Sequence, residues 1–324
     1  MLKKLDADLS LDLDNKWAYL RTHGDERWES LPSYLPFVVP HILQTLQQLD
    51  LTITFFIVGQ DAELSINDEA LTSIAEAKHE IANHSFSHEP WLQRYSHEQL
   101  GEEFERTEAA LAKYAKHPLV GFRAPGYSLS GDVLEMLCER GYQYDCSTLP
   151  TYLGPAARAY YIFKSSFSKD QAQDRKDLFG SFSDGFRSLR PYYWSTPAGE
   201  ILELPVSTIP IVRTPFHFSY LHYLSQFSKL ASRMYLAMAL TVCKLTRTSP
   251  SLLLHPLDFL GADEVPELDF FPGMRQSGDT KRKYVANALR GYSRAFNVLP
   301  MMRRAEQLAL KKDKLPRVTR LPHR

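Results

Sequence analysis

The sequence predicts an α/β protein built around parallel strands, and three observations lead to that prediction. Continuous apolar runs typical of strands buried on both faces, such as 51–58 (LTITFFIV), alternate with segments of helical periodicity such as 38–49. Polar residues capable of chemistry follow the ends of these strands, where barrels of parallel strands place their active sites. The 324 residues, 44% of them hydrophobic, suffice for one large domain of the size that α/β barrels commonly reach.

The expected elements alternate along the chain. Strands are predicted at 8–13, 51–58, 80–82, 120–123, 142–146, 201–207 and 251–254. Helices are predicted at 38–49, 67–78, 96–116, 131–140, 220–245 and 281–296. Residues 15–34 are expected to form a loop and 150–196 an insertion, in a barrel domain of residues 1–305 that a mobile basic tail (306–324) follows.

Composition excludes several classes of protein. A formal net charge of zero argues against a protein built to hold nucleic acid. The N-terminus lacks the apolar core of a signal peptide, and no stretch reaches the length of a membrane span, so a cytoplasmic location is expected. Three cysteines without CxxC spacing are expected to be free thiols in a reducing compartment.

His84 and His88 are the clearest candidates for metal ligands. They lie four residues apart in NHSFSHEPW (83–91), and on one helical turn such residues face the same way. The spacing alone is weak evidence, because eleven histidines make chance pairs common and a pair of surface or loop histidines is the ordinary alternative. The prediction therefore depends on polar residues elsewhere in the chain.

Asp12 and Asp14 supply carboxylates at the end of the first predicted strand. Being two residues apart in an extended chain, they face the same side, which suits a base beside a metal ligand. An Asx-type turn that closes the strand is the ordinary alternative, and a glycosyltransferase DxD also remains open. A calcium-binding EF-hand is excluded, because Lys16 and Trp17 stand where that loop needs an oxygen ligand and a glycine.

Two later strands also end in residues suited to catalysis. Arg123 ends a short strand and precedes Pro125 and Gly126, a rigid turn in which the backbone can approach a ligand closely. The alternative there is an ordinary turn with a solvated arginine. His255 follows the apolar run 251–254, although a lone histidine in such a place is more often a satisfied core residue.

Taken in chain order, these motifs resemble those of the polysaccharide deacetylase family with the NodB homology domain (carbohydrate esterase family 4-like). The resemblance extends over roughly 8–256. It implies a distorted barrel of about seven parallel strands and a divalent metal, most often zinc. It matches the metal triad to Asp14, His84 and His88, the catalytic base to Asp12, the arginine that orients this base to Arg123, and the general acid to His255.

Residues that would contact the substrate are also expected. A backbone N–H near Gly126 would stabilise the oxyanion, and Tyr127 would lie beside it. Trp17 is one of several aromatic residues in 15–34 that could line a sugar site, the alternative being that these rings only pack the loop. Asp145 is a candidate partner of His255, the equal alternative being an aspartate that caps a turn.

The chain departs from the family pattern in three places. Its first motif is Asp-Leu-Asp-Asn where many members have adjacent aspartates, so the roles of Asp12 and Asp14 could be exchanged. The third motif, 123–127, lacks an aromatic residue before Gly126, and the fourth, 145–150, lacks the usual tryptophan.

The expected activity is metal-dependent removal of an N-acetyl group from an amino sugar. Two alternatives stay open: hydrolysis of another C–N bond (a deformylase or a cyclic imide or ureide hydrolase), and non-catalytic glycan binding. A cytoplasmic enzyme would meet a nucleotide-linked or lipid-linked saccharide. The apolar helix 220–245 and the basic tail could then rest on the inner face of the membrane, the alternative being a helix that packs on the barrel. The oligomeric state is left open.

Overall fold

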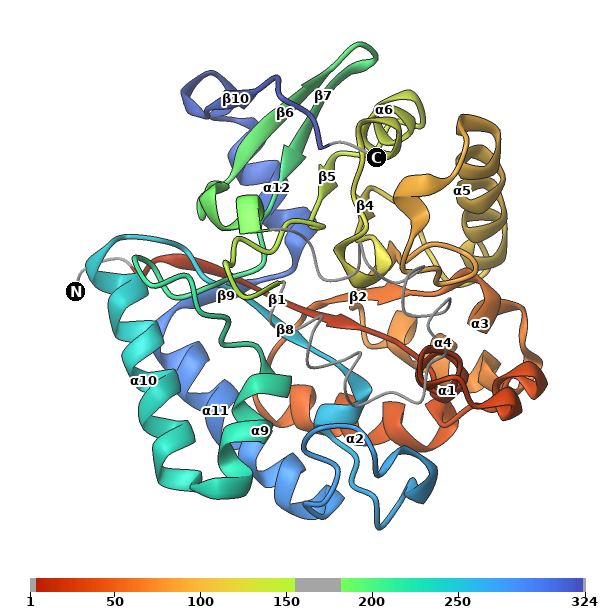
Figure 1. The fold of residues 1–324 in the computed structure, drawn as a ribbon, viewed down its shortest axis with the longest axis vertical. Coiled ribbons are helices and arrows are strands. Elements are labelled where there is room, and N and C mark those ends of the chain that lie inside the picture. The colour runs from red at the N-terminus through yellow and green to blue at the C-terminus, as the bar shows by residue number, and fades with distance from the viewer. Residues whose placement is uncertain (1–3, 155–181, 323–324) are drawn as a thin grey trace.

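A computed structural model describes residues 4–154 and 182–322, which form helices around one mixed sheet (Figure 1). Its hydrogen-bonded order is β10-β6-β7-β5-β4-β3-β2-β1-β8, with β9 also paired to β1. The strands are β1 (Asp6–Asp12), β2 (Thr54–Ile57), β3 (Glu80–Asn83), β4 (Gly121–Phe122), β5 (Tyr144–Asp145), β6 (Tyr192–Thr196), β7 (Gly199–Glu203), β8 (Ser251–Leu254), β9 (Asn297–Leu299) and β10 (Arg317–Val318). The path from β7 to β8 is parallel throughout, whereas β6 runs antiparallel to β7.

The predicted α/β fold with mostly parallel strands is confirmed. The seven strands from β7 to β8 correspond to the seven predicted from the sequence. Closure into a barrel is not shown, because the strand pairing among the described residues leaves β8 at the end of the path. The two sides nevertheless approach each other, since the Ser207 N–H, four residues beyond β7, donates to the Ser251 carbonyl of β8 at 3.1 Å.

Helices lie outside the sheet and bury its apolar residues (Figure 1). They are α1 (Lys16–His23), α2 (Leu35–Gln48), α3 (Gly59–Glu63), α4 (Asp68–Glu76), α5 (His97–Leu111), α6 (Gly131–Glu139), α9 (Phe218–Phe227), α10 (Lys229–Leu245), α11 (Gly278–Ala295) and α12 (Met301–Ala309). In the described part of the chain, no helix combines the length and the apolar character that crossing a membrane requires.

Two sequence predictions about local structure are wrong. The segment 15–34 is not only a loop, because Asn15 caps α1 by accepting from the Lys16 N–H at 2.8 Å. The single helix predicted at 220–245 is two helices, since Ser228 is extended and its side chain caps the start of α10. The predicted insertion contains β6, while its residues 155–181 lie outside the described residues.

The C-terminal residues are also more ordered than predicted. Instead of a mobile tail, residues 306–322 continue α12 and then form β10, which pairs with β6. Lys312 and Arg317 both form ion pairs with Glu200, at 2.9 and 2.7 Å. The sequence did not reveal this strand because β10 has only two residues, too few for a periodic pattern.

The carboxyl ends of the parallel strands bring the predicted site residues to one edge of the sheet. β1 ends at Asp12, and the residues that directly follow β3, β4 and β8 are His84, Arg123 and His255. Parallel strands in register place these ends side by side, so residues more than 240 positions apart in sequence become neighbours. The site is therefore a consequence of strand order.

Candidate metal and catalytic site

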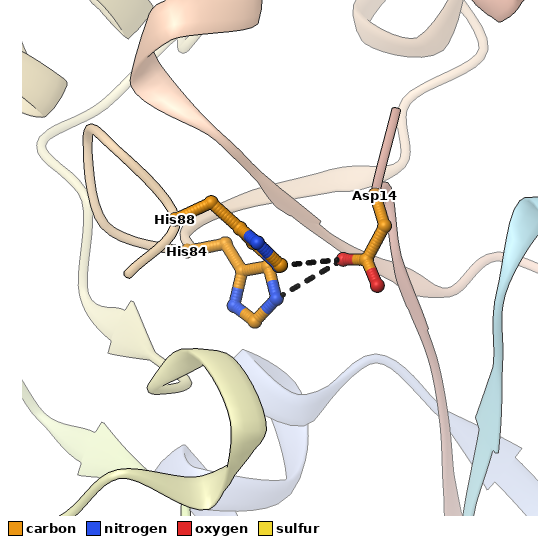
Figure 2. A group of neighbouring side chains, drawn as sticks. All are labelled: Asp14, His84 and His88. Carbon is orange, nitrogen blue, oxygen red and sulfur yellow. Dashed lines mark hydrogen bonds and ion pairs between the residues drawn. The ribbon is translucent and has the colours of Figure 1, made fainter. Parts of the chain in front are cut away.

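Asp14, His84 and His88 converge as the sequence predicted. Asp14 Oδ1 lies 3.3 Å from His84 Nε2 and 3.1 Å from His88 Nε2, and one possible ligand atom from each residue lies within 4.8 Å of the others. Figure 2 shows both imidazole rings directed at the same carboxylate oxygen. Two imidazoles and one carboxylate are a donor set typical of catalytic zinc sites.

The protonation of His84 shows that this cluster suits a cation. His84 Nδ1 lies 2.7 Å from the Arg123 carbonyl, which can only accept, so Nδ1 carries the proton. In the neutral ring, Nε2 then presents a lone pair to the Asp14 carboxylate, and two acceptors would face each other. A positive charge among the three side chains removes this repulsion, and a divalent metal held by these residues would supply it.

The histidines lie on a loop, so the helical turn expected for this spacing is wrong. Ser85 and His88 have positive φ angles of 61° and 51°, values that L-residues rarely adopt. Such conformations persist where the surroundings enforce them, and they are common at functional sites. Here the backbone, not helical periodicity, directs both rings to Asp14.

Two charged residues hold this loop from behind. Glu103 of α5 accepts hydrogen bonds from the backbone N–H groups of Phe86 (2.8 Å) and Ser87 (3.0 Å) and from the Ser87 hydroxyl. Arg21 of α1 donates to the carbonyls of Ser87 and His88, both at 2.7 Å. The peptide groups next to His88 are therefore fixed by side chains on two helices.

Asp14 has further partners that keep it ionised. The Tyr19 hydroxyl donates to Asp14 Oδ2 at 3.2 Å, and the Tyr34 hydroxyl donates to its carbonyl at 2.6 Å. Burial raises the pKa of Asp14, but positive charge on His88, and on His84 when its ring is protonated, outweighs burial and leaves this pKa well below its usual value. The Asp14 carboxylate is therefore available as an anionic ligand.

Asp12 forms a buried ion pair with Arg123. Arg123 Nη1 lies 2.6 Å from Asp12 Oδ1, and the two side chains are 1% and 7% exposed. The guanidinium also donates to Ser10 Oγ (2.9 Å) and to the Cys146 carbonyl (3.2 Å), and it lies over the Phe56 ring. Arg123 thus fixes the orientation of Asp12 and compensates its charge.

His255 completes the group from β8. Its Nε2 lies 4.0 Å from Asp12 Oδ2, and its side chain is 19% exposed, so the ring borders both the Asp12 carboxylate and solvent. Asp258 holds the turn, because its Oδ2 accepts from the His255 N–H at 2.7 Å. The His217 ring packs 6.4 Å from His255, and burial, with the charge of His255 adding to it, lowers the pKa of His217 to about 3.

Gly126 and Tyr127 lie at the mouth of this group. Both have positive φ angles, 59° and 61°, in the short turn that follows β4. Gly126 is exposed, whereas the Tyr127 N–H already donates to the Ala124 carbonyl at 3.1 Å. Burial raises the pKa of the Tyr127 hydroxyl above its usual value and the nearby Asp12 charge raises it further, so Tyr127 stays neutral beside Asp12.

Trp17 does not occupy a substrate-binding position. Its side chain is fully buried, and its Nε1 donates to Asp61 Oδ1 at 2.8 Å. The ring packs edge-on against His88, with centroids 6.3 Å apart. Trp17 therefore packs against the candidate metal ligand His88, in agreement with the alternative that the aromatic residues of 15–34 only pack this segment.

Asp145 is not the partner of His255 in this structure. It accepts from the backbone N–H and hydroxyl of Ser147, at 3.0 and 2.6 Å, and therefore caps the turn after β5. It also lies beside Glu203, and burial raises the pKa of both carboxyls. The residue that contacts the backbone of His255 is Asp258.

Sequence reasoning missed the supporting residues Glu103, Arg21, Asp258 and His217. Glu103 is one of several acidic residues in α5, and nothing in the sequence separates it from the exposed ones. Asp258 could have been found, because it stands three residues after His255 and behind a proline, a spacing typical of a capping side chain.

Comparison with known proteins confirms the resemblance predicted from the motifs. Residues 27–144 match the family described as polysaccharide deacetylase. This match contains His84, His88 and Arg123, whereas Asp12, Asp14 and His255 lie outside it.

Two curated relatives carry related names. The peptidoglycan-N-acetylglucosamine deacetylase of Bacillus cereus is 30% identical over 108 residues, 33% of this chain and 49% of the relative. The peptidoglycan deacetylase of Helicobacter pylori is 26% identical over 183 residues, 55% of this chain and 60% of the relative. The matches thus span about half to three fifths of the length of these relatives.

A solved structure supports the fold over the whole chain. A protein from Mycobacterium smegmatis, whose description as a polysaccharide deacetylase is itself provisional, aligns with a TM-score of 0.60 at 21% identity. The alignment covers 99% of this chain and 96% of that protein. The two chains therefore share an architecture.

Proposed function

We propose that this protein is a metal-dependent hydrolase that removes the N-acetyl group from an amino sugar in a glycan or lipid-linked saccharide. One observation carries the proposal: a candidate metal triad and a base–acid pair, Asp12 and His255, lie at the same edge of the sheet. The two groups are in electrostatic contact, because the charges of Asp12 and Asp14 raise the pKa of His84 against the effect of burial. The deacetylase names of the relatives agree with this chemistry.

A divalent metal bound by Asp14, His84 and His88 would polarise the acyl oxygen of the substrate as a Lewis acid. Asp12 would accept a proton from the attacking water, whose oxygen forms a bond to the acyl carbon. Arg123 holds Asp12 in place for this transfer, because their ion pair is buried and short. The exposed Gly126 backbone would donate to the oxyanion, with no side chain in the way.

His255 would then protonate the leaving nitrogen as the C–N bond breaks, giving acetate and the free amine. The position of His255 suits this role, since its ring is 4.0 Å from Asp12 yet still reaches solvent. The neighbouring His217 cannot share the role, because its pKa of about 3 keeps it neutral at physiological pH. Each step of the hydrolysis thus has a residue of this chain to perform it.

The test measures metal content and acetate release together. Wild type reconstituted with zinc is expected to hold about one metal per chain and to release acetate from N-acetylglucosamine oligomers. His84→Ala should lose both metal and activity. Asp12→Asn should keep the metal but lose activity by at least about 100-fold, since general base catalysis contributes roughly 10²–10⁴.

Exposed residues outside the site provide matched controls. His97→Ala and Asp313→Asn should change neither metal content nor acetate release, because both side chains lie on the surface away from the triad. Fully metallated wild type that releases no acetate from any N-acetylated saccharide would contradict deacetylation. Release of formate from an N-formyl sugar instead would establish the deformylase alternative, and wild type that stays metal-free in excess zinc would overturn the metal site.

A further inference from the structure

The segment between β7 and β8 has an unusual charge pattern. Between Glu203 and Asp258 there is no acidic residue, while five cations occur there: Arg213, Lys229, Arg233, Lys244 and Arg247. The last four are exposed, on or next to α10. A stretch of 54 residues without a carboxylate is unexpected in a chain whose acidic and basic residues balance.

The same segment contains much of the exposed apolar surface. Of the fourteen large hydrophobic side chains that are exposed in the described residues, eight lie between positions 204 and 257. Six of them, which we call the hairpin surface, are on α9 and α10: Tyr223, Phe227, Leu230, Met234, Met238 and Leu245. Contiguous apolar patches on a soluble protein mark places where something binds.

The spacing on α10 makes these residues one stripe. Leu230, Met234, Met238 and Leu245 follow at intervals of four, four and seven, so they share one face of the helix. The opposite face is buried against the protein through residues that include Leu236, Ala239, Leu240 and Cys243. A helix that is apolar on both faces is normally covered on both, yet here Leu230, Met234 and Leu245 are 68%, 63% and 79% exposed.

The tip of the hairpin extends this stripe. Phe227 and Leu230 flank the extended Ser228, and Phe227 is 75% exposed. Tyr223 and Phe227 pack edge to face, with ring centroids 5.4 Å apart, so the two rings form one aromatic ridge on α9. In Figure 1, α9 and α10 form the hairpin at the lower left of the molecule, beside α11.

Cations border the stripe on the side of α11. A shallow groove of about 340 Å³ between α10 and α11 is lined by Arg233 and Lys244, and none of its lining residues is acidic. Neither cation forms an ion pair with another described residue, and Lys244 Nζ lies over the Phe296 ring, 5.5 Å from its centroid. Apolar side chains beside unpaired lysine and arginine are typical of helices that lie in the headgroup region of a membrane.

We propose that the hairpin surface, together with Arg233 and Lys244, binds the surface of an anionic lipid bilayer. Charge decides against a second copy of this chain as the occupant, because a symmetric contact would set this acid-free segment against itself and offer its cations no carboxylate. An anionic headgroup complements both parts of the surface: the cations meet phosphate, and the stripe enters the acyl boundary. The C-terminal cations contribute less than the sequence suggested, since Lys312 and Arg317 are paired with Glu200.

This surface lies close to the candidate active site. α9 begins directly after His217, whose ring packs against His255, and ends at Phe227 ten residues later. At 1.5 Å per residue, the aromatic ridge is about 15 Å from the catalytic group along the helix. If the proposed function holds, a bound bilayer would present a lipid-linked saccharide to the candidate active site. The binding of the bilayer does not depend on the proposed function.

Vesicle flotation tests the binding without any measurement of activity. Wild type is expected to float with phosphatidylcholine vesicles that contain phosphatidylglycerol, at least about tenfold more than with phosphatidylcholine alone, and to be released by high salt. Leu230→Gln/Met234→Gln/Met238→Gln should abolish flotation, and Arg233→Gln/Lys244→Gln should remove the preference for anionic vesicles. The melting temperatures of both variants should match wild type, since all five side chains are exposed.

Two matched variants test whether the loss of any exposed apolar or basic side chains reduces flotation. Ile66→Gln/Leu310→Gln removes two equally exposed apolar residues elsewhere, and Lys116→Gln/Lys311→Gln removes two exposed cations elsewhere. Both should float like wild type. The proposal is overturned if wild type does not bind anionic vesicles or if the stripe variant binds as well as wild type. It is also overturned if light scattering shows that wild type is a dimer and that Leu230→Gln/Met234→Gln/Met238→Gln is a monomer. The hairpin surface would then be a dimer interface. Failed deacetylation would leave flotation unchanged, so the two proposals fail independently.

Discussion

The candidate metal half of the site and the proposed proton-transfer half are held in different ways. His84 and His88 sit on a strained loop that Glu103 and Arg21 fix through its peptide groups. Asp12 is fixed by one buried guanidinium, and His255 by a turn that Asp258 holds through a backbone N–H. The difference predicts that the two halves can be damaged separately, so their contributions can be measured separately.

The largest effect is expected from Arg123→Met. This change leaves Asp12 buried without its partner, so activity should fall by at least about 100-fold and the free energy of unfolding by roughly 3 kcal/mol. Metal content should stay near wild type, because the carbonyl of residue 123 still accepts from His84 Nδ1. Elemental mass spectrometry, acetate assays and denaturant unfolding check the three parts.

Arg123→Lys is the control for that experiment. It keeps a positive charge but cannot bind Asp12, Ser10 and the Cys146 carbonyl at once, so it should recover stability more than activity. Loss of metal in Arg123→Met would show that the two halves are not separable and would contradict the comparison.

Glu103→Gln should give the opposite pattern at intermediate size. The N–H groups of Phe86 and Ser87 share one carboxylate oxygen, which the amide oxygen can replace, but the amide nitrogen cannot accept from the Ser87 hydroxyl. The loop therefore loosens, and metal affinity should fall by about 10–100-fold. Activity should return at saturating metal, because no proton-transfer residue is altered. Competition with a chelator measures the affinity, and Glu105→Gln, on the exposed side of α5, is the matched control. Activity that stays low at saturating metal would refute a purely positioning role.

The smallest effect on activity, with a gain in stability, is expected from Asp258→Asn. Asparagine can still accept from the His255 N–H, so kcat should fall only several-fold while metal content is unchanged. Burial raises the pKa of Asp258 from 3.8 to about 6, which means that its ionised form costs the folded state about 1–3 kcal/mol.

The pH dependence of this gain has a definite sign. Between about pH 4 and pH 6 the folded protein binds a proton at Asp258 that the unfolded chain has released, so wild-type stability from this group declines as pH rises through that window. Asp258→Asn lacks this decline. Its melting temperature should therefore exceed that of wild type at pH 7 and approach it at pH 4, and thermal unfolding at both values checks this. An equal difference at both pH values would contradict the assignment.

The sequence predicted the strands and the residues at their ends because both depend on local patterns. Buried apolar runs identified β2 and β8, and polar residues at or directly after the strand ends identified Asp12, His84, Arg123 and His255. Once the strands are parallel and adjacent, their carboxyl ends must meet, so local prediction was sufficient for the convergence of the site.

The rest depends on contacts that no local pattern contains. Glu103 lies on α5, and nothing in the spacing of that helix shows that it turns toward the 84–88 loop. Trp17 is of a residue type that often binds sugars, but its side chain is buried and donates a hydrogen bond to Asp61. The break at Ser228 was hidden because apolar periodicity continues from α9 into α10. Side-chain partners distant in sequence decided the first two cases, whereas the break at Ser228 is fixed by a local cap of α10.

Arg123 serves the two halves with different parts of itself: its guanidinium binds Asp12, and its carbonyl accepts from His84. Only the contact with Asp12 requires an arginine side chain, since every residue has a backbone carbonyl that could accept from His84. A descendant of this protein could therefore exchange Arg123, lose hydrolysis, and still inherit a complete metal centre. Selection for catalysis would therefore conserve arginine at position 123, whereas selection for metal binding alone would tolerate other residues there.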